Sequence, residues 1–332
     1  MSSGGFVVLN PGGRDPDQHF PNGAGDISDA GHPPVNYHGY AACMRGHFLR
    51  NVKSVPEGTR VALVLLRKRN LRQALAAIEK LKARGVRTFI SFKESGAHQV
   101  ADFLSDYGRT MLFRRICAAA DGYLSSTPDL ESVYRGAGCR NGKFIPTPYP
   151  VEEWDRSIPR EKRLGFFVGT REFGVPSRNH WQAVALANDL SLELQVPAAV
   201  MNVHGRRGLM LLAEIRGSNP FLQIIAGPLP YRDYLRLLGA HRLVLQLDSS
   251  AVPGQVAGDA LLCRTPCVGG NGAVERIAFP DLAAVTPQQA ADRVRELMTD
   301  DARWDEVVAN SQRIARERLS FSAIRAELEA LA

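Results

Sequence analysis

Short apolar runs alternate with amphipathic stretches along the first half of the chain. Runs typical of buried strands occur at 6–9, 60–66, 86–92, 122–126 and 143–146. Between them, apolar residues recur at helical spacing, which predicts helices at 70–84 and around 97–119. Because strands that alternate with helices form parallel sheets, we expect a doubly wound α/β domain here.

A second alternation follows a proline-rich, charged stretch at 147–163, which has the composition of a linker. Further strands are predicted at 164–169, 222–226, 243–247 and 266–269, and further helices at 180–190, 231–238, 256–262 and 288–299. We therefore expect two domains, at 1–150 and 151–314, with a C-terminal helix at about 315–332 that packs back on the first.

The segment 14–36 is rich in Gly, Pro, Asp and His and has no periodicity. It is longer than an ordinary connector, and such loops often serve substrates. The strand before it ends at Asn10-Pro11-Gly12-Gly13, where two glycines allow a ligand to approach the backbone closely.

The composition is that of a globular protein. The chain has 332 residues, of which 45% are hydrophobic and 23% charged, enough for two cores. It shows neither a long apolar span nor a signal peptide, so we expect a cytoplasmic protein without a transmembrane segment. Five scattered cysteines indicate neither a disulfide framework nor a zinc site, and are interpreted as small buried hydrophobes in a reducing compartment.

The positive charge belongs to the first half. Residues 1–150 hold 20 Lys and Arg against 12 Asp and Glu, whereas residues 151–332 hold 21 against 22. Single runs such as 67–69 and 114–115 are typical of solvated faces, but together the excess points to an anionic partner. No helix-turn-helix, zinc-finger or RNA-recognition signature is present, so nucleic acid ranks below a glycan or a lipid.

The end of the first half resembles a known family. The stretch AADGYLSSTPDLESVYRGAGCRNGKFIPTPYP places Asp121, Ser126, Ile145 and Pro146 where the large retaining group of GT-B glycosyltransferases, related to sucrose synthase and the bacterial mannosyltransferases, has its corresponding residues. The resemblance implies an α/β GT-B fold, with two Rossmann-like domains facing each other across a cleft.

The loop FFVGTREFGVPSRN, at 166–179, resembles the segment with which this group opens its donor domain, where basic side chains hold the donor diphosphate. The family's lysine position falls on Arg178, and its arginine corresponds to Thr170-Arg171, displaced by one. A guanidinium binds phosphate oxygens in a bidentate way and stays charged. The resemblance thus gives Arg178 a catalytic role; the alternative is an ordinary cation at a helix start.

The stretch 231–277 resembles the family's donor-binding pattern almost without gaps. Of two family acids spaced E-x7-E, the second, which commonly binds the ribose hydroxyls, falls on Asp259. The first, close to the donor sugar, falls on Ala251, and this departure bears on sugar recognition and activity. Asp248 is a candidate substitute.

The residues before Asp259 have a physical reading of their own. Gly254, Gln255 and Val256 stand at a loop-to-helix transition, where backbone N–H groups can face a diphosphate. A carboxylate one turn into the helix can accept hydrogen bonds from ribose hydroxyls. The alternative is a plain turn followed by a first-turn helix acid.

In the first domain, Gly12-Gly13 corresponds to the family's glycine-rich loop near the donor phosphate and the acceptor. The family often carries a histidine after a middle strand, and that region here is ISFKESGAHQ. Lys93, Glu94 and His98 are the catalytic candidates, and the resemblance does not choose among them. His98 fits a helix-surface histidine equally well.

The implied reaction is retaining glycosyl transfer from a UDP- or GDP-type sugar, with no further cofactor. No essential metal is expected, because Arg178, Arg171 and the helix start would stabilise the departing diphosphate. The acceptor is expected to be anionic, such as a lipid-linked glycan or a phosphorylated sugar. Two alternatives remain: a non-catalytic GT-B-like binding protein, favoured by Ala251 and the loop 14–36, and a sugar-nucleotide epimerase.

Overall fold

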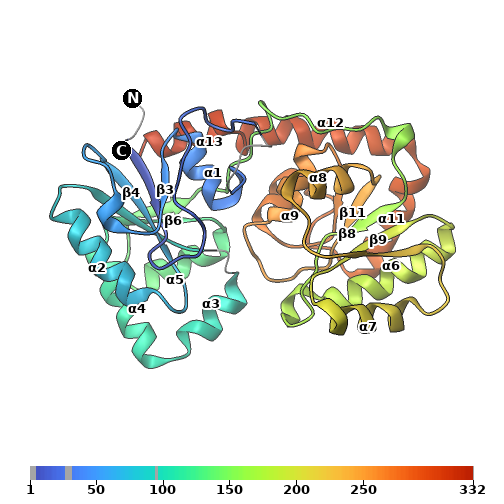
Figure 1. Ribbon diagram of the computed structural model, residues 1–332, viewed down its shortest axis with the longest axis horizontal. Coiled ribbons are helices and arrows are strands. Elements are labelled where there is room, and N and C mark those ends of the chain that lie inside the picture. The colour runs from blue at the N-terminus through green and yellow to red at the C-terminus, as the bar shows by residue number, and fades with distance from the viewer. Residues whose placement is uncertain (1–4, 27–31, 94–95, 332) are drawn as a thin grey trace. The chain divides into compact units, whose positions relative to one another are not determined.

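The computed structural model describes residues 5–26, 32–93 and 96–331 (Figure 1). The chain divides into two compact units. The first comprises Met1–Glu153, Ala251–Pro253 and Glu317–Ala332, and the second comprises Trp154–Ser250 and Gly254–Arg316.

The described part of the first unit holds a seven-stranded sheet in the order β2-β3-β1-β4-β5-β6-β7. Its strands are β1 Phe6–Leu9, β2 Gln18–His19, β3 His47–Leu49, β4 Val61–Leu66, β5 Arg87–Phe92, β6 Gly122–Ser125 and β7 Gly142–Phe144. All neighbours pair in parallel except β2 and β3. The five predicted strands are confirmed, and the parallel pairing follows from the helical crossovers between them.

The helices of this unit are α1 Asn36–Cys43, α2 Leu71–Lys82, α3 Ala97–Leu104, α4 Tyr107–Ala119, α5 Glu131–Gly136 and α13 Phe321–Glu329, with short 3-10 turns at Val52–Ser54 and Pro128–Leu130. The predicted helix 70–84 forms as α2 because its apolar residues make one buried stripe that packs on β4 and β5. It ends before Gly85, whose φ of 75° suits a helix terminus.

Two sequence expectations for this unit are corrected. The segment 14–36 is not wholly irregular, because it contains β2, which pairs with β3 further along the chain. The C-terminal helix predicted at about 315–332 is two helices: α12 Asp301–Arg318 ends, and Ser320 begins α13 by accepting a hydrogen bond from the Ala323 N–H at 3.2 Å. Helix α13 packs on α1, where Arg325 Nε donates to the Cys43 carbonyl at 2.6 Å.

The described part of the second unit holds a five-stranded parallel sheet in the order β10-β9-β8-β11-β12. The strands are β8 Phe166–Val168, β9 Ala198–Asn202, β10 Leu222–Ala226, β11 Leu243–Leu245 and β12 Cys267–Val268. The helices are α6 His180–Leu194, α7 Gly205–Arg216, α8 Tyr231–Gly239, α9 Gln255–Leu262, α10 Ala273–Ala278, α11 Pro287–Thr299 and α12, with 3-10 turns at Arg160–Lys162 and Pro176–Arg178. Helices α6 and α7 pack side by side on β9 (Figure 1).

Each sheet has a point where the strand order reverses. In the second sheet, the chain runs outward from β8 through β9 and returns to the other side of β8 as β11. In the first sheet, the same reversal separates β1 from β4. Open α/β sheets bind ligands outside the carboxyl ends of the strands at such switch points. The loops after β8 and β11, and those after β1 and β4, are therefore the places to look for a site.

Candidate functional site

The loop after β8 packs tightly on α9. An added Cβ atom at Gly169 would lie 2.5 Å from Val256 Cγ1, so only glycine permits this approach. Thr170, expected to bind the donor, is buried, and its Oγ1 lies 3.1 Å from His180 Nδ1. The structure thus engages the Thr170 hydroxyl with the first residue of α6.

Asp259, buried on α9, is the centre of a polar cluster. The Tyr231 hydroxyl at the start of α8 donates to Asp259 Oδ1 at 2.6 Å. The Arg171 guanidinium lies 5.5 Å from the centre of the Tyr234 ring. Its positive charge lowers the pKa of Asp259, and so does a side-chain hydrogen bond from Gln255. The structure therefore brings together three predicted donor residues: Arg171, Gln255 and Asp259.

Burial controls the charge of Asp259. Its exposed fraction is 1%, and loss of solvation raises its pKa to about 7, against the lowering effects of Tyr231, Arg171 and Gln255. The alternative of a first-turn helix acid is wrong, because Asp259 lies beyond the first turn of α9. Tyr231 was missed by sequence reasoning, although it opens the 231–277 resemblance.

The N-terminus of α9 begins at Gly254, which has a φ of 96°. The first N–H groups of any helix have no partner within it, so they can face an anion. Gly254 is buried, whereas Gln255 and Val256 are half-buried. Glu275 on α10, which sequence reasoning also missed, packs against this turn: an added Cβ atom at Gly254 would lie 2.0 Å from its Oε2.

Arg178 is held by Asp248. The two side chains form an ion pair, and Asp248 Oδ1 also accepts the Ser250 N–H at 2.8 Å. The Arg178 side chain remains 24% exposed, and its buried Nε has no hydrogen-bond partner among the described residues. Asp248, the candidate substitute for the missing acid, is instead paired with Arg178, the side chain predicted to bind the donor phosphate. Ala251 itself is buried, with a φ of 50°.

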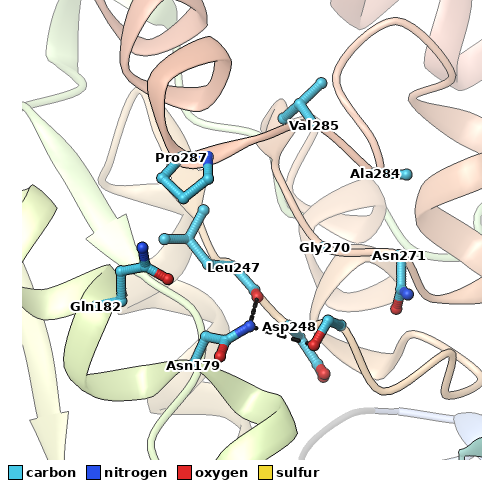
Figure 2. A pocket seen from close by; sticks show the side chains of 10 residues that line it. Asn179, Gln182, Leu247, Asp248, Gly270, Asn271, Ala284, Val285 and Pro287 are labelled. Atoms are coloured by element: carbon cyan, nitrogen blue, oxygen red, sulfur yellow. Dashed lines mark hydrogen bonds between the residues drawn. The ribbon is translucent and has the colours of Figure 1, made fainter.

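A pocket of ≈ 270 Å³ opens at the carboxyl ends of β11 and β12 (Figure 2). Asn179 forms part of its wall and donates to the Leu247 carbonyl at 2.9 Å and to Ser249 Oγ at 3.2 Å. Its lining residues are Asn179, Gln182, Leu247, Asp248, Ser249, Gly270, Asn271, Ala284, Val285 and Pro287. Asp248 of the Arg178–Asp248 pair thus lines the pocket, together with other residues of the stretch 231–277 that resembles the donor-binding pattern. None of the residues predicted to bind the donor lines it.

The first unit places Gly12 and Gly13 after β1, at its own switch point, and Lys93 follows β5 but reaches Asp15 in the loop after β1. An added Cβ atom would lie 2.3 Å from Gln73 Oε1 at Gly12, and 2.3 Å from Asn10 Nδ2 at Gly13. The φ of 66° favours glycine at position 12, and the side chain and carbonyl of Asn10 crowd position 13, so features of the protein itself account for both glycines.

Lys93 is buried at the end of β5, with its Nζ 2.6 Å from Asp15 Oδ2. Burial by itself raises the pKa of Asp15, but the hydrogen bond and charge of Lys93 outweigh it, and the pKa lies below its ordinary value. His98 is exposed in the first turn of α3, and Glu94 lies outside the described residues.

One sequence feature was overlooked in expecting a metal-free site. Asp15-Pro16-Asp17 has the Asp-x-Asp spacing of some metal sites. Here Asp15 pairs with Lys93, and Asp17 accepts from Arg50 Nε at 3.1 Å. Within the described ranges, no group of three or more His, Cys, Asp or Glu side chains is placed to hold a metal ion.

Two further properties concern the chain as a whole. The five cysteines, all within the described ranges, are buried free thiols, as expected. None of the helices in the described part of the chain has both the length and the apolar character needed to cross a bilayer.

Sequence comparison identifies no relative: no family model and no curated protein matches the chain. Solved structures do match. A trehalose-6-phosphate synthase studied for glycosyl transfer with retention is 10% identical, with a TM-score of 0.62 over 84% of this chain and 75% of that one. A UDP-forming trehalose-phosphate synthase from Burkholderia xenovorans is 15% identical, with a TM-score of 0.60 over 89% and 78%.

S. aureus TarM, in a complex that contains UDP, is 11% identical, with a TM-score of 0.61 over 88% of this chain and 58% of that one. The expected fold class is therefore confirmed: the chain has the GT-B fold, with two Rossmann-like domains. At these identities the likeness concerns the fold alone.

Proposed function

We propose that this protein is a glycosyltransferase whose nucleotide-sugar site lies at the carboxyl ends of β8 and β11 in the second unit. The observation that carries the proposal is the Asp259 cluster. The buried Asp259 carboxylate already accepts a hydrogen bond from one hydroxyl group, that of Tyr231. It lies just beyond the first turn of α9, a helix whose N-terminus suits a diphosphate. A ribose would present hydroxyl groups of the same kind.

The diphosphate would lie between Arg171, Arg178 and the first N–H groups of α9, at Gln255 and Val256. During transfer, the bond from the anomeric carbon to the phosphate oxygen breaks, and its electron pair stays on the diphosphate. These cations and dipoles stabilise that negative charge. The acceptor oxygen then bonds to the anomeric carbon, and its proton passes to a released phosphate oxygen. Because Asp248 offsets its charge, Arg178 contributes less than a free arginine would.

A UDP donor and retention are proposed on the descriptions of the structural neighbours, one of which is UDP-forming and another studied for retention. GDP is the second nucleotide to test. The acceptor is proposed to be anionic, a phosphorylated or lipid-linked glycan, because residues 1–150 carry 20 basic against 12 acidic side chains. Gly12, Gly13, Lys93 and His98 are proposed as the ligand contacts of the first unit.

A binding assay tests the donor site directly. UDP, GDP, ADP and dTDP are titrated by calorimetry into the wild type, Asp259→Asn and Asp233→Asn, the last being a matched control on the exposed face of α8. One nucleotide should bind the wild type and the control equally. Asp259→Asn should bind it roughly tenfold to a hundredfold more weakly, since hydrogen bonds to a charged group are lost. Equal binding by all three proteins would remove the Asp259 assignment.

The non-catalytic alternative is favoured by one observation, Ala251 in place of the family's first acid. Incubation of the wild type with the matching nucleotide sugar separates the two functions. Slow release of the nucleotide and free sugar would establish that the protein cleaves the donor. Arg178→Ala should slow this release, and Arg206→Ala, on the exposed face of α7, should not. Tight binding with no release, with or without candidate acceptors, would favour the binding protein.

A further inference from the structure

Glu275 carries a carboxyl oxygen that the described structure leaves unused. Its side chain is 2% exposed, and its Oε1 accepts from Gln246 Nε2 at 2.6 Å. Its Oε2 has no hydrogen-bond partner among the described residues. Buried polar atoms of this kind are rare in native proteins, and they concentrate at functional sites.

The unused oxygen lies against the N-terminus of α9. Added Cβ atoms would lie 2.0 Å from Oε2 at Gly254 and 2.3 Å from it at Gly272. Any side chain at either position would therefore push the carboxyl away. The absence of side chains at Gly254 and Gly272 leaves room for the Glu275 carboxyl beside the N-terminus of α9, where the donor diphosphate is proposed to bind.

The charges around Glu275 come from several elements. The loop after β11 contributes Asp248, the loop before α6 contributes Arg178, and strand β12 contributes the Cys267 thiol. Arg276 is the next residue along α10. Arg178 is already paired with Asp248, so Glu275 has no cation of its own in the described network. Burial first, and then the charge of Asp248, raise the pKa of Glu275 to about 7, against the hydrogen bonds and Arg178.

We propose that Glu275 is part of the phosphate site, and that an anion at the N-terminus of α9 binds together with the neutral acid form of Glu275, so that binding takes up one proton. The donor-site part of this inference rests on the proposed function. Two negative charges at one buried helix end would repel each other, whereas a carboxylic acid leaves the helix dipole to the anion. Its O–H also supplies a donor at the oxygen that now has no partner.

The sign of the pH dependence follows. Below the pKa of Glu275 the acid is already protonated, and affinity for the anion is constant. Above it, binding must also bring a proton, so affinity falls by up to about tenfold per pH unit. Asp259, the buried acid on α9, must be ionised to accept hydrogen bonds from the ribose hydroxyls. Its ionisation therefore strengthens nucleotide binding as the pH rises, which is opposite to the effect of Glu275.

The test counts protons. UDP and, separately, inorganic sulfate are titrated into the wild type by calorimetry at about pH 8, in two buffers that differ in ionisation enthalpy. At this pH Asp259 is ionised in both states, and neither ligand changes its own charge appreciably. We expect close to one proton taken up for each ligand, and weaker binding as the pH rises. Glu275→Gln should bind without proton uptake, and Glu214→Gln, an exposed acid on α7, should behave as the wild type does.

The possible outcomes separate the two ideas. UDP binding without proton uptake would overturn the role of Glu275 and leave the proposed function intact. Sulfate binding with proton uptake, but no nucleotide binding, would support Glu275 and sink the nucleotide assignment. If neither ligand binds, both fail. Should Glu275→Gln not fold, as judged by circular dichroism, the proton count of the wild type still decides.

Discussion

The two switch points share a topology and differ in how they treat buried charge. In the first unit, Lys93 and Asp15 neutralise each other, and the pKa of Asp15 lies below its ordinary value. In the second unit, Asp259 and Glu275 are buried without a paired cation, and burial raises both pKa values to about 7. The first arrangement is complete within the protein, whereas the second lacks groups that a ligand can supply. The same strand order thus carries a closed ionic pair in one unit and open acid sites in the other.

The largest expected effect is a difference in how the two units respond to pH. Asp259 and Glu275 both have raised pKa values in the folded protein. Their contribution to the free energy of unfolding is therefore fully present below the unfolded-chain pKa of about 4, and it is lost as the pH rises through about 7. The second unit should lose about 2 to 4 kcal/mol of opening free energy between about pH 4 and pH 8, because His180, whose pKa burial lowers to about 4, offsets part of the loss caused by the two acids. The first unit should respond with the opposite sign and weaken on acidification from about pH 6.5, because burial lowers the pKa of His38 to about 2 and the Lys93 pair lowers that of Asp15.

Hydrogen exchange resolved by peptide measures both units in one experiment, after correction for the intrinsic rates. Amides of β8 and β11 report on the second unit, and those of β4 and β5 on the first. The double variant Asp259→Asn, Glu275→Gln should flatten the pH response of β8 and β11 alone. A response of equal size in both units would remove the contrast between the switch points.

The next effect concerns the ionic pair of the first unit. Replacing Lys93 by Met leaves Asp15 partly buried without its cation, and should cost about 3 kcal/mol in denaturant unfolding. Adding Asp15→Asn should restore much of that loss, because it removes the unpaired charge. Lys68→Met is the matched control: its pair with Asp102 is exposed, so the change should stay below about 1 kcal/mol. Equal losses for Lys93→Met and Lys68→Met would show that the Lys93 pair is not structural.

Periodicity predicted the parts of the fold that have one buried face. Helix α2 was found because its apolar stripe is regular, but α1 is buried on all sides and shows no such stripe. Strand β9 was missed between α6 and α7. The division of charge along the chain also follows from the sequence, since it needs no coordinates.

The site was only partly predictable. Resemblance singled out Arg171 and Asp259, and the loop-to-helix transition singled out Gln255; the fold brings the three together. The pairing of Arg178 with Asp248 joins positions 70 residues apart, and no spacing rule shows it. The burial of Glu275 depends on two glycines from different loops, so its unused oxygen appears only in three dimensions.

The smallest effect tests how Asp259 is held. Tyr231→Phe removes the hydroxyl that donates to Asp259 Oδ1, and should raise the pKa of Asp259 further, because that hydrogen bond lowers it. Nucleotide binding should weaken by roughly threefold to tenfold near neutral pH, since one hydrogen bond is worth about 1 kcal/mol. The loss should shrink as the pH rises, because Asp259 is then ionised in both proteins. Tyr107→Phe, which changes a side chain that is 79% exposed, should bind as the wild type does. A loss that is independent of pH would mean that Tyr231 contacts the nucleotide itself rather than tuning Asp259.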